Sequence, residues 1–193
     1  MAGISAIRVG QLENASLLGP TQGSILWTLR DGVQVEIRLI QPGDEQRMIK
    51  FHQGLSARSV YMRYFESLSL SVRTAHARLA RICFADPEHQ IVLVALSVEP
   101  QCSHHKIVAV GRLNKSPEPK KAAVSLLVLD EFQGRGLGSE LLRQLIQIAL
   151  DHRISRIEAE MLRDNTAFQR VLKKMGFRLR LIDPRSVRAV LSL

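Results

Sequence analysis

A glycine-rich turn between a predicted strand and a predicted helix constrains the fold of this chain most strongly. The turn is Gln133-Gly134-Arg135-Gly136-Leu137-Gly138; an apolar run at 124–129 precedes it, and an amphipathic helix is predicted from Ser139 to Arg153. Backbone N–H groups and the positive end of the helix dipole then converge on one point, which suits a phosphate. Glycine adopts backbone angles that other residues avoid, so a pyrophosphate can approach the chain closely.

The spacing of the turn separates it from two other phosphate-binding motifs. A P-loop requires Gly-Lys-Ser/Thr at its end, whereas here Ser139 and Glu140 follow Gly138. A dinucleotide fingerprint requires a glycine at the position of Ser139. The pattern that fits is Q-x-x-G-x-G, which resembles the pyrophosphate turn of the GNAT superfamily of N-acetyltransferases. That resemblance implies that the chain binds acetyl-CoA as a cosubstrate.

Further segments resemble the acetyltransferase domain of bacterial protein-lysine acetyltransferases. They are Thr28 to Gly32, Ile37 to Ile40, Gly43 to Glu45, Phe51 to Phe65 with its Leu-Ser-x-x-Ser-x-Tyr-x-Arg-Tyr-Phe stretch, Asp164-Asn165 and Gly176-Phe177. The likeness implies an N-acetyltransferase domain over residues 26–193. Residues 1–25 contain several glycines and little periodicity, so they are predicted to form a loosely attached arm.

The order of predicted elements agrees with that family. Strands are expected at 33–39, 89–98, 107–113, 122–129, 157–162, 177–182 and 187–193, and 24–28 is compatible with an edge strand. Helices are expected at 42–55, 56–65, 71–83 and 139–153, and a further one opens at Asn165. Antiparallel strands followed by strand–helix–strand–helix indicate an α/β protein. The expected architecture is the GNAT fold, a mixed central β-sheet with helices on both faces.

Composition suits one globular domain. The chain has 193 residues, of which 46% are hydrophobic, and no apolar stretch reaches the length of a membrane span. The first ten residues make a poor signal peptide, and Cys83 and Cys102 do not form a disulfide framework, so we expect a cytoplasmic protein. The histidines show no metal-ligand spacing with the cysteines, so no metal is expected.

The net charge of +9 has several possible explanations. It can describe a solvated arginine-rich surface, binding of the CoA phosphates or attraction of an acidic partner. The basic residues are dispersed and aromatic residues are only 5%, which disfavours a nucleic-acid-binding role.

The resemblance implies which residues bind acetyl-CoA. The backbone of Leu126, Leu127 and Val128 would hydrogen-bond the pantetheine amides by strand addition. The turn would hold the pyrophosphate through Gln133, Gly134, Arg135, Gly136, Leu137, Gly138 and Ser139. Arg135 would either contact a phosphate or point to solvent. Asn165 would hold the pantetheine arm, cap the following helix, or do both.

Two groups that the family uses for proton transfer are missing from this sequence. The glutamate near the start of the strand before the turn is replaced by Ala123, and the tyrosine four residues before the Gly-Phe glycine is replaced by Leu172. Candidate replacements are Glu160, which shares a strand face with Glu158, and Tyr61. The competing interpretations are a solvent-exposed or salt-bridged glutamate pair and a tyrosine that serves only packing.

Three functions remain open at this point. The first is transfer of acetyl from acetyl-CoA to a primary amine, most simply a protein lysine. The second is a catalytically weak or inactive acyl-CoA-binding regulatory module, which Ala123 and Leu172 favour. The third is acetylation of a small-molecule amine. In the protein-acetylating branch the segment around Arg58, Tyr61 and Arg63 covers the acceptor entrance, where its arginines would favour lysines in acidic surroundings.

Overall fold

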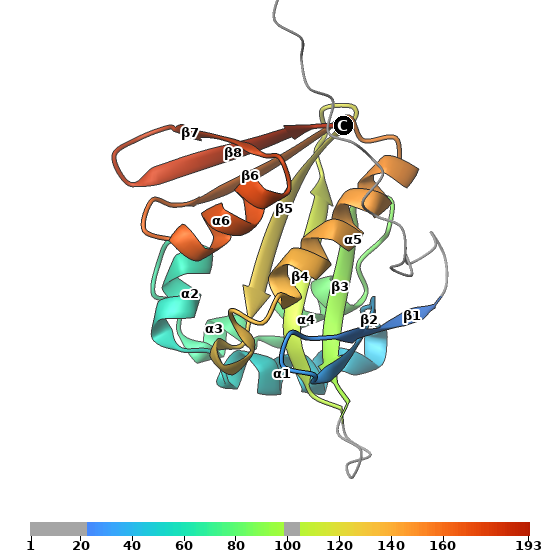
Figure 1. The fold of residues 1–193 in the computed structure, drawn as a ribbon. Helices are drawn as coiled ribbons and strands as arrows, with labels where there is room; N and C mark the ends of the chain where they lie inside the picture. Colours follow the sequence, from blue (N-terminus) through green and yellow to red (C-terminus); the bar gives the residue numbers. More distant parts are fainter. Residues whose placement is uncertain (1–22, 99–104) are drawn as a thin grey trace, which may run out of the picture.

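The computed structural model, which describes residues 23–98 and 105–193, has a mixed β-sheet at its centre (Figure 1). Within these residues the sheet has eight strands in the order β1-β2-β3-β4-β5-β6-β8-β7. The strands are β1 (Ser24–Thr28), β2 (Gln34–Leu39), β3 (Gln90–Ser97), β4 (Ile107–Lys115), β5 (Lys121–Val128), β6 (Arg156–Leu162), β7 (Arg178–Leu181) and β8 (Ser186–Ser192). Neighbouring strands are antiparallel except β5 and β6, which are parallel. The predicted α/β GNAT fold is confirmed.

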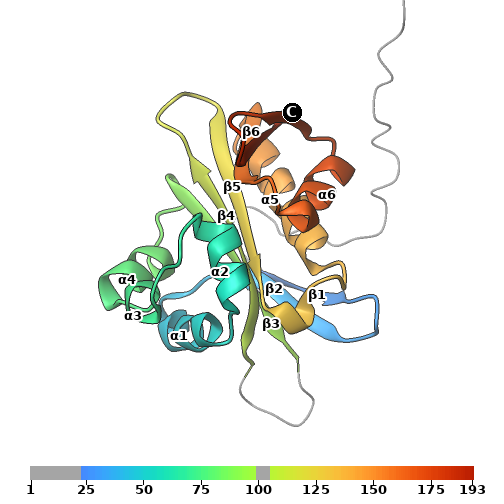
Figure 2. The ribbon, with the colours of Figure 1, turned by 90° about the vertical axis from the view of Figure 1, so that its left-hand side faces the viewer.

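Helices cover both faces of the sheet. Those on one face are α1 (Glu45–Gln53), α2 (Ala57–Tyr64), α3 (Leu70–Arg73) and α4 (His76–Cys83); those on the other are α5 (Leu137–Asp151) and α6 (Thr166–Lys174) (Figure 2). Short 3-10 turns at Pro42–Asp44 and Asp130–Phe132 precede α1 and the glycine turn. The central strands are therefore buried from both sides, which explains why β3 is a continuous apolar run.

The prediction of one helix over 71–83 is wrong, because the chain breaks it into α3 and α4. Ser69 caps α3 by accepting from the backbone N–H of Val72 at 3.4 Å. At the other end the Thr74 hydroxyl donates to the carbonyl of Leu70 at 2.8 Å, and Ala75 is extended. A hydroxyl bonded back to its own turn competes with helix continuation, which apolar periodicity does not reveal.

The main hydrophobic contact on the second face is made by α5. Its buried stripe consists of Leu137, Leu141, Leu142, Leu145 and Ile148, which recur at the spacing of one helix face. These side chains pack against β4 and β5. Burying a leucine contributes about 1.5–3 kcal/mol relative to leaving it exposed. The stripe therefore fixes the start of α5, and with it the glycine turn, against the end of β5.

The sheet opens between β5 and β6. These strands pair only over the three residues 121–123 with 156–158, whereas β4 follows β5 as far as Val128 and β8 follows β6 along its whole length. One backbone edge of residues 124–128 thus faces a gap rather than a neighbouring strand. Figure 1 shows β5 and β6 diverging from the end of the sheet at which the C-terminus lies.

The predicted arm at 1–25 falls largely on residues 1–22, which lie outside the described residues, while Ser24 and Ile25 belong to β1. Cys102 also lies outside them, and Cys83 is buried. Among the helices of the described residues, none combines the length and the apolar character needed to cross a membrane.

Candidate active site

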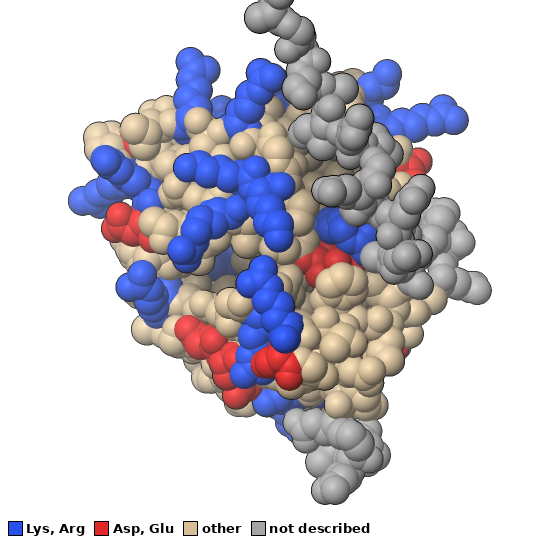
Figure 3. Space-filling model, in the orientation of Figure 1, with Lys and Arg blue, Asp and Glu red and all other residues tan. Residues whose placement is uncertain are grey.

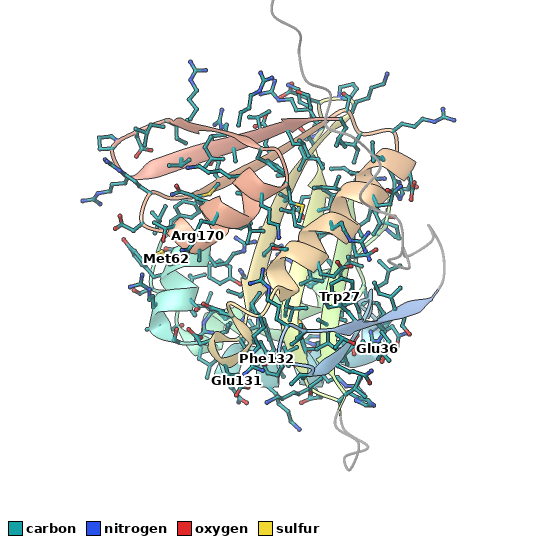
Figure 4. The ribbon with its side chains drawn as sticks, viewed as in Figure 1. Trp27, Glu36, Met62, Glu131, Phe132 and Arg170 are labelled. Carbon is teal, nitrogen blue, oxygen red and sulfur yellow. The ribbon has the colours of Figure 1, made fainter. Side chains whose placement is uncertain are left out.

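The gap between β5 and β6 continues into a cleft of about 530 Å³, which we call the cofactor cleft. This volume is within the range of pockets that take small molecules. Its walls come from residues 125–128 of β5, the glycine turn, α2, β6 and α6. Figure 4 labels Met62, Phe132 and Arg170, which line the cleft from α2, the 3-10 turn and α6.

Two glycines give the turn its shape. Gly134 has a φ of 75° and Gly136 a φ of 95°, both in the left-handed region that side chains with a Cβ rarely adopt. Gly136 is also the N-cap of α5. The first N–H groups of a helix have no intrahelical partner. Since Gly136, Gly138 and Ser139 line the cofactor cleft, the positive end of α5 meets it.

Gln133 ties the turn to its surroundings. Its side-chain Nε2 donates to the carbonyl of Val128 at 3.0 Å and to the hydroxyl of Ser59 at 3.1 Å. One amide group therefore connects the turn to the end of β5 and to α2. This explains why a glutamine stands three residues before Gly136 in the pattern.

Asp130 fixes α2 against the end of β5. Its carboxylate accepts from the N–H and the hydroxyl of Ser56, at 3.1 and 2.7 Å, and from the hydroxyl of Ser59 at 2.9 Å. Ser56 also caps α2 by accepting from the N–H of Ser59. Desolvation raises the pKa of Asp130, but these hydrogen bonds outweigh it, so the pKa is lowered and the carboxylate stays charged. The two serines of the Leu-Ser-x-x-Ser motif thus attach α2 to Asp130 at the end of β5.

Most of the residues predicted to bind the cofactor line the cofactor cleft. These are Leu126, Leu127, Val128, Gln133, Gly134, Gly136, Gly138, Ser139 and Asn165. The side-chain Oδ1 of Asn165 also accepts from the N–H of Phe168 at 3.2 Å, so the residue caps α6 as well as facing the cleft.

Arg135 and Leu137 are not among the cleft-lining residues. Arg135 forms an ion pair with Asp31 at 3.1 Å, and its guanidinium lies 5.1 Å from the ring centroid of Phe132. Leu137 is only 1% exposed and belongs to the core beneath the turn. Arg135 therefore holds the turn against the hairpin of β1 and β2.

The two candidate catalytic residues differ in position. Glu160 lines the cofactor cleft, and its Oε1 accepts from Nε and Nη2 of Arg188 at 3.0 and 2.6 Å. Glu158 is paired with Arg156 at 2.7 Å. Tyr61 is on the exposed side of α2, outside the residues that line the cleft, with 41% of its surface accessible.

The two substituted positions carry no titratable group. Leu172 is fully buried in α6. Ala123 is exposed, and it is the last residue of β5 that pairs with β6, where it stands opposite Glu158. His52, in α1, is buried, and burial first, then Arg73 and Arg78, lower its pKa to about 4. His52 is therefore neutral at pH 7. No group of three His, Cys, Asp or Glu residues suited to a metal occurs within 23–98 and 105–193.

Basic side chains surround the cofactor cleft, and only Arg58 and Arg63 among them were singled out in the sequence. Those that line it are Arg30, Arg58, Arg63, Arg170 and Lys174, against the acidic Asp130, Glu160 and Asp164. Figure 3 shows Lys and Arg side chains gathered around a hollow on this face. Arg30, Arg170 and Lys174 come from segments far from α2, so only the net charge of +9 indicated them in the sequence.

A strand-edge gap that leads into a glycine turn at a helix start defines an acyl-CoA-dependent transferase of the GNAT type. The family model described as "Acetyltransferase (GNAT) domain" matches residues 34–178, which is most of the chain. The chain therefore belongs to the GNAT acetyltransferase family, whose members are acyltransferases that use acetyl-CoA.

Individual relatives agree with this assignment. The chain is 26% identical to Acetyltransferase Pat of Mycolicibacterium smegmatis over 88% of its own length and 48% of that protein, so it spans about half of this curated relative. It is similar to the crystal structure of the GNAT domain of S. lividans PAT, with 26% identity, a TM-score of 0.75 and coverage of 88% and 97% of the two chains.

The fold is also that of Mycobacterium smegmatis RimJ, a structure in complex with CoA-disulfide. Identity is 15%, the TM-score is 0.68, and the match covers 88% of this chain and 86% of that chain. At this identity the likeness concerns the fold alone.

Proposed function

We propose that the protein transfers the acetyl group of acetyl-CoA to a primary amine, and that the acceptor is a protein lysine. The observation that carries the proposal is the unpaired edge of β5, which leads directly into the glycine turn at the start of α5. The lysine acceptor rests on the Leu-Ser-x-x-Ser segment and on the likeness to the Pat proteins.

Each part of the cofactor has a matching part of the cleft in this proposal. The backbone of residues 126–128 binds the pantetheine amides as an added strand. The N–H groups of the turn and the dipole of α5 bind the pyrophosphate. Arg30, Arg170 and Lys174 supply further positive charge for the phosphates. Asn165 meets the pantetheine arm from the start of α6.

The transfer step depends mainly on placement. The neutral amine attacks the thioester carbonyl, the tetrahedral intermediate collapses, and CoA leaves as a thiol after protonation. The carboxylates of Asp130, Glu160 and Asp164 line the cleft. Glu160 is proposed to take the amine proton, alongside solvent, from its position beside Arg188. Tyr61 is proposed to act at the acceptor entrance rather than on the thioester, because it lies outside the cleft lining.

The second candidate is an acyl-CoA-binding module without catalysis. It is favoured by the apolar Leu172 and Ala123, since neither can move a proton. One experiment separates the candidates: the protein is incubated with acetyl-CoA and lysine-bearing proteins, and free thiol and acetyl-lysine are followed together. Matching growth of both supports the transferase, whereas tight acetyl-CoA binding with neither product supports the binding module. Acetylation of a free amine alone would indicate a small-molecule acceptor.

A further inference from the structure

Three arginines converge on the acceptor-side face of the sheet, beneath α2. Arg63 comes from α2, Arg78 from α4 and Arg112 from β4; together we call them the arginine cluster. The guanidinium carbons of Arg63 and Arg78 each lie 5.1 Å from the ring centroid of Tyr64. Arg112 stands opposite Ser125 in the pairing of β4 with β5, and Arg63 Nη2 donates to the Ser125 hydroxyl at 2.7 Å. These contacts bring three positive charges to one place.

No carboxylate neutralises these charges within the described part of the chain. None of the three arginines forms an ion pair with an Asp or Glu of residues 23–98 and 105–193. Within the same residues, the buried Nε atoms of Arg78 and Arg112 have no hydrogen-bond partner. Buried charged donors without a partner are costly, because they lose water and gain nothing in exchange.

The surroundings add positive rather than negative charge. Arg73 is buried nearby and donates to the carbonyls of His52 and Leu68 at 2.7 and 3.2 Å. His52 stays neutral at pH 7, as its lowered pKa requires. Burial, together with the charges of Arg63 and Arg78, lowers the pKa of Arg112 to about 10, which still leaves it charged at neutral pH.

A small cavity lies against the cluster. It has a volume of about 20 Å³ and is lined by Arg63, Arg112, Tyr64, Ser125 and His52 together with apolar side chains. Such a volume exceeds the roughly 10–15 Å³ that one water needs, so only a small terminal group can enter it. Arg63 and Ser125 line both this cavity and the cofactor cleft, so the cavity adjoins the cleft.

We propose that the arginine cluster is a binding site for a single carboxylate group. Arginine presents paired donors that match the two oxygens of a carboxylate. Arg63 and Arg112 line the small cavity, and the Nε of Arg112 has no partner among the described residues, while Arg78 adds positive charge beside them. The carboxylate comes either from a small free acid or from an acidic group of the acceptor, whose amine would then be held near β5. The second source rests on the proposed function; the site itself does not.

The first test uses sodium acetate as the probe and thermal melting as the readout. At constant ionic strength, balanced with the bulky sulfonate MES, acetate should raise the melting temperature of the wild type saturably. The rise should vanish in Arg112→Met and shrink in Arg78→Met. Without acetate both variants should melt no lower than the wild type, because charge repulsion is relieved. Arg81→Met, an exposed neighbour on the same helix, should keep the full response. An acetate response absent from the wild type, or retained in Arg112→Met, would overturn the site.

The second test identifies the source of the carboxylate. Two lysine peptides that differ only in Glu or Gln beside the lysine are compared by KM and kcat. An acceptor carboxylate predicts a KM lower by about tenfold or more for the Glu peptide, a gap that closes in Arg112→Met. A free acid instead predicts equal KM values and equal stimulation of both peptides by acetate. Absence of transfer to any acceptor would reject the proposed function, while the acetate melts would still decide the carboxylate site.

Discussion

Ser59 and Gln133 hydrogen-bond each other across the space between α2 and the glycine turn, with Gln133 Nε2 donating to Ser59 Oγ at 3.1 Å. The same hydroxyl donates to Asp130 at 2.9 Å. The helix that borders the acceptor side is thereby joined to the turn proposed to hold the pyrophosphate. A substitution that removes this hydrogen bond from α2 should therefore alter the glycine turn.

Ser59→Ala is expected to weaken acetyl-CoA binding by about five- to tenfold, since a hydrogen bond of this kind contributes about 1 kcal/mol. Affinity falls because Gln133 keeps only one of its two hydrogen-bond partners, so the glycine turn is less well fixed. Titration calorimetry measures the change, with the exposed Ser67→Ala as control. Wild-type affinity in Ser59→Ala would show that the bond does not support the turn.

Glu160→Gln tests whether Glu160 takes the proton of the acceptor amine in place of the family's glutamate. The rate of acetyl transfer should fall about tenfold at pH 7, and the deficit should shrink as the pH approaches the pKa of the lysine amine, because solvent then removes the proton. For the wild type, the rate should keep climbing with pH without a plateau near neutrality. Equal rates for wild type and variant across the whole pH range would exclude Glu160 from proton transfer.

Tyr61→Ala should weaken use of the acceptor more than binding of acetyl-CoA. Tyr61 is exposed on α2, whose other side lines the cofactor cleft, so its ring can contact the acceptor without touching the cofactor. Initial rates on lysine peptides should show a higher KM for the peptide and an unchanged KM for acetyl-CoA. A lower melting temperature with both KM values unchanged would instead assign the ring to packing.

His52 should make the protein sensitive to mild acid. Its pKa is about 4 in the folded protein against about 6.5 when unfolded, so the unfolded state binds the proton first. Stability is full above pH 6.5 and falls as the pH drops toward 4, by up to about 3 kcal/mol. Urea unfolding at several pH values should show this loss in the wild type and a smaller one in His52→Leu. The same pH dependence in both proteins would refute the assignment.

Local sequence patterns predicted much of this fold. Alternation in β2, the apolar run of β3 and the stripe of α5 are short-range signals, and each element formed within a few residues of its predicted bounds. The glycine turn is also predictable from a short stretch of sequence, because Gly134 and Gly136 occupy backbone angles that select glycine.

Features that depend on pairing between distant segments could not be predicted from local patterns. The role of Asp130 depends on serines more than seventy residues earlier. The divergence of β5 from β6 follows from no local pattern, and only the family resemblance, which implies strand addition at β5, indicates it. The sequence leaves open whether Arg135 contacts a phosphate or points to solvent. Its partner in the structure, Asp31, belongs to a hairpin distant in the sequence. The arginine cluster likewise joins three elements, none of which is unusual alone.

The central claim is that the glycine turn binds acetyl-CoA, and calorimetry on Gly136→Val tests it most directly. At a φ of 95° a valine is strained. Its Cβ would lie 3.6 Å from Nε of Arg30, and both residues line the cofactor cleft at the proposed pyrophosphate site. Wild-type protein should bind acetyl-CoA with a micromolar or tighter constant, about −8 kcal/mol or better, and Gly136→Val should bind almost none. Gly43→Val, in an open turn with an ordinary φ, is the matched control, and melting curves are needed to check that both variants are folded. Unchanged affinity in folded Gly136→Val would contradict the account.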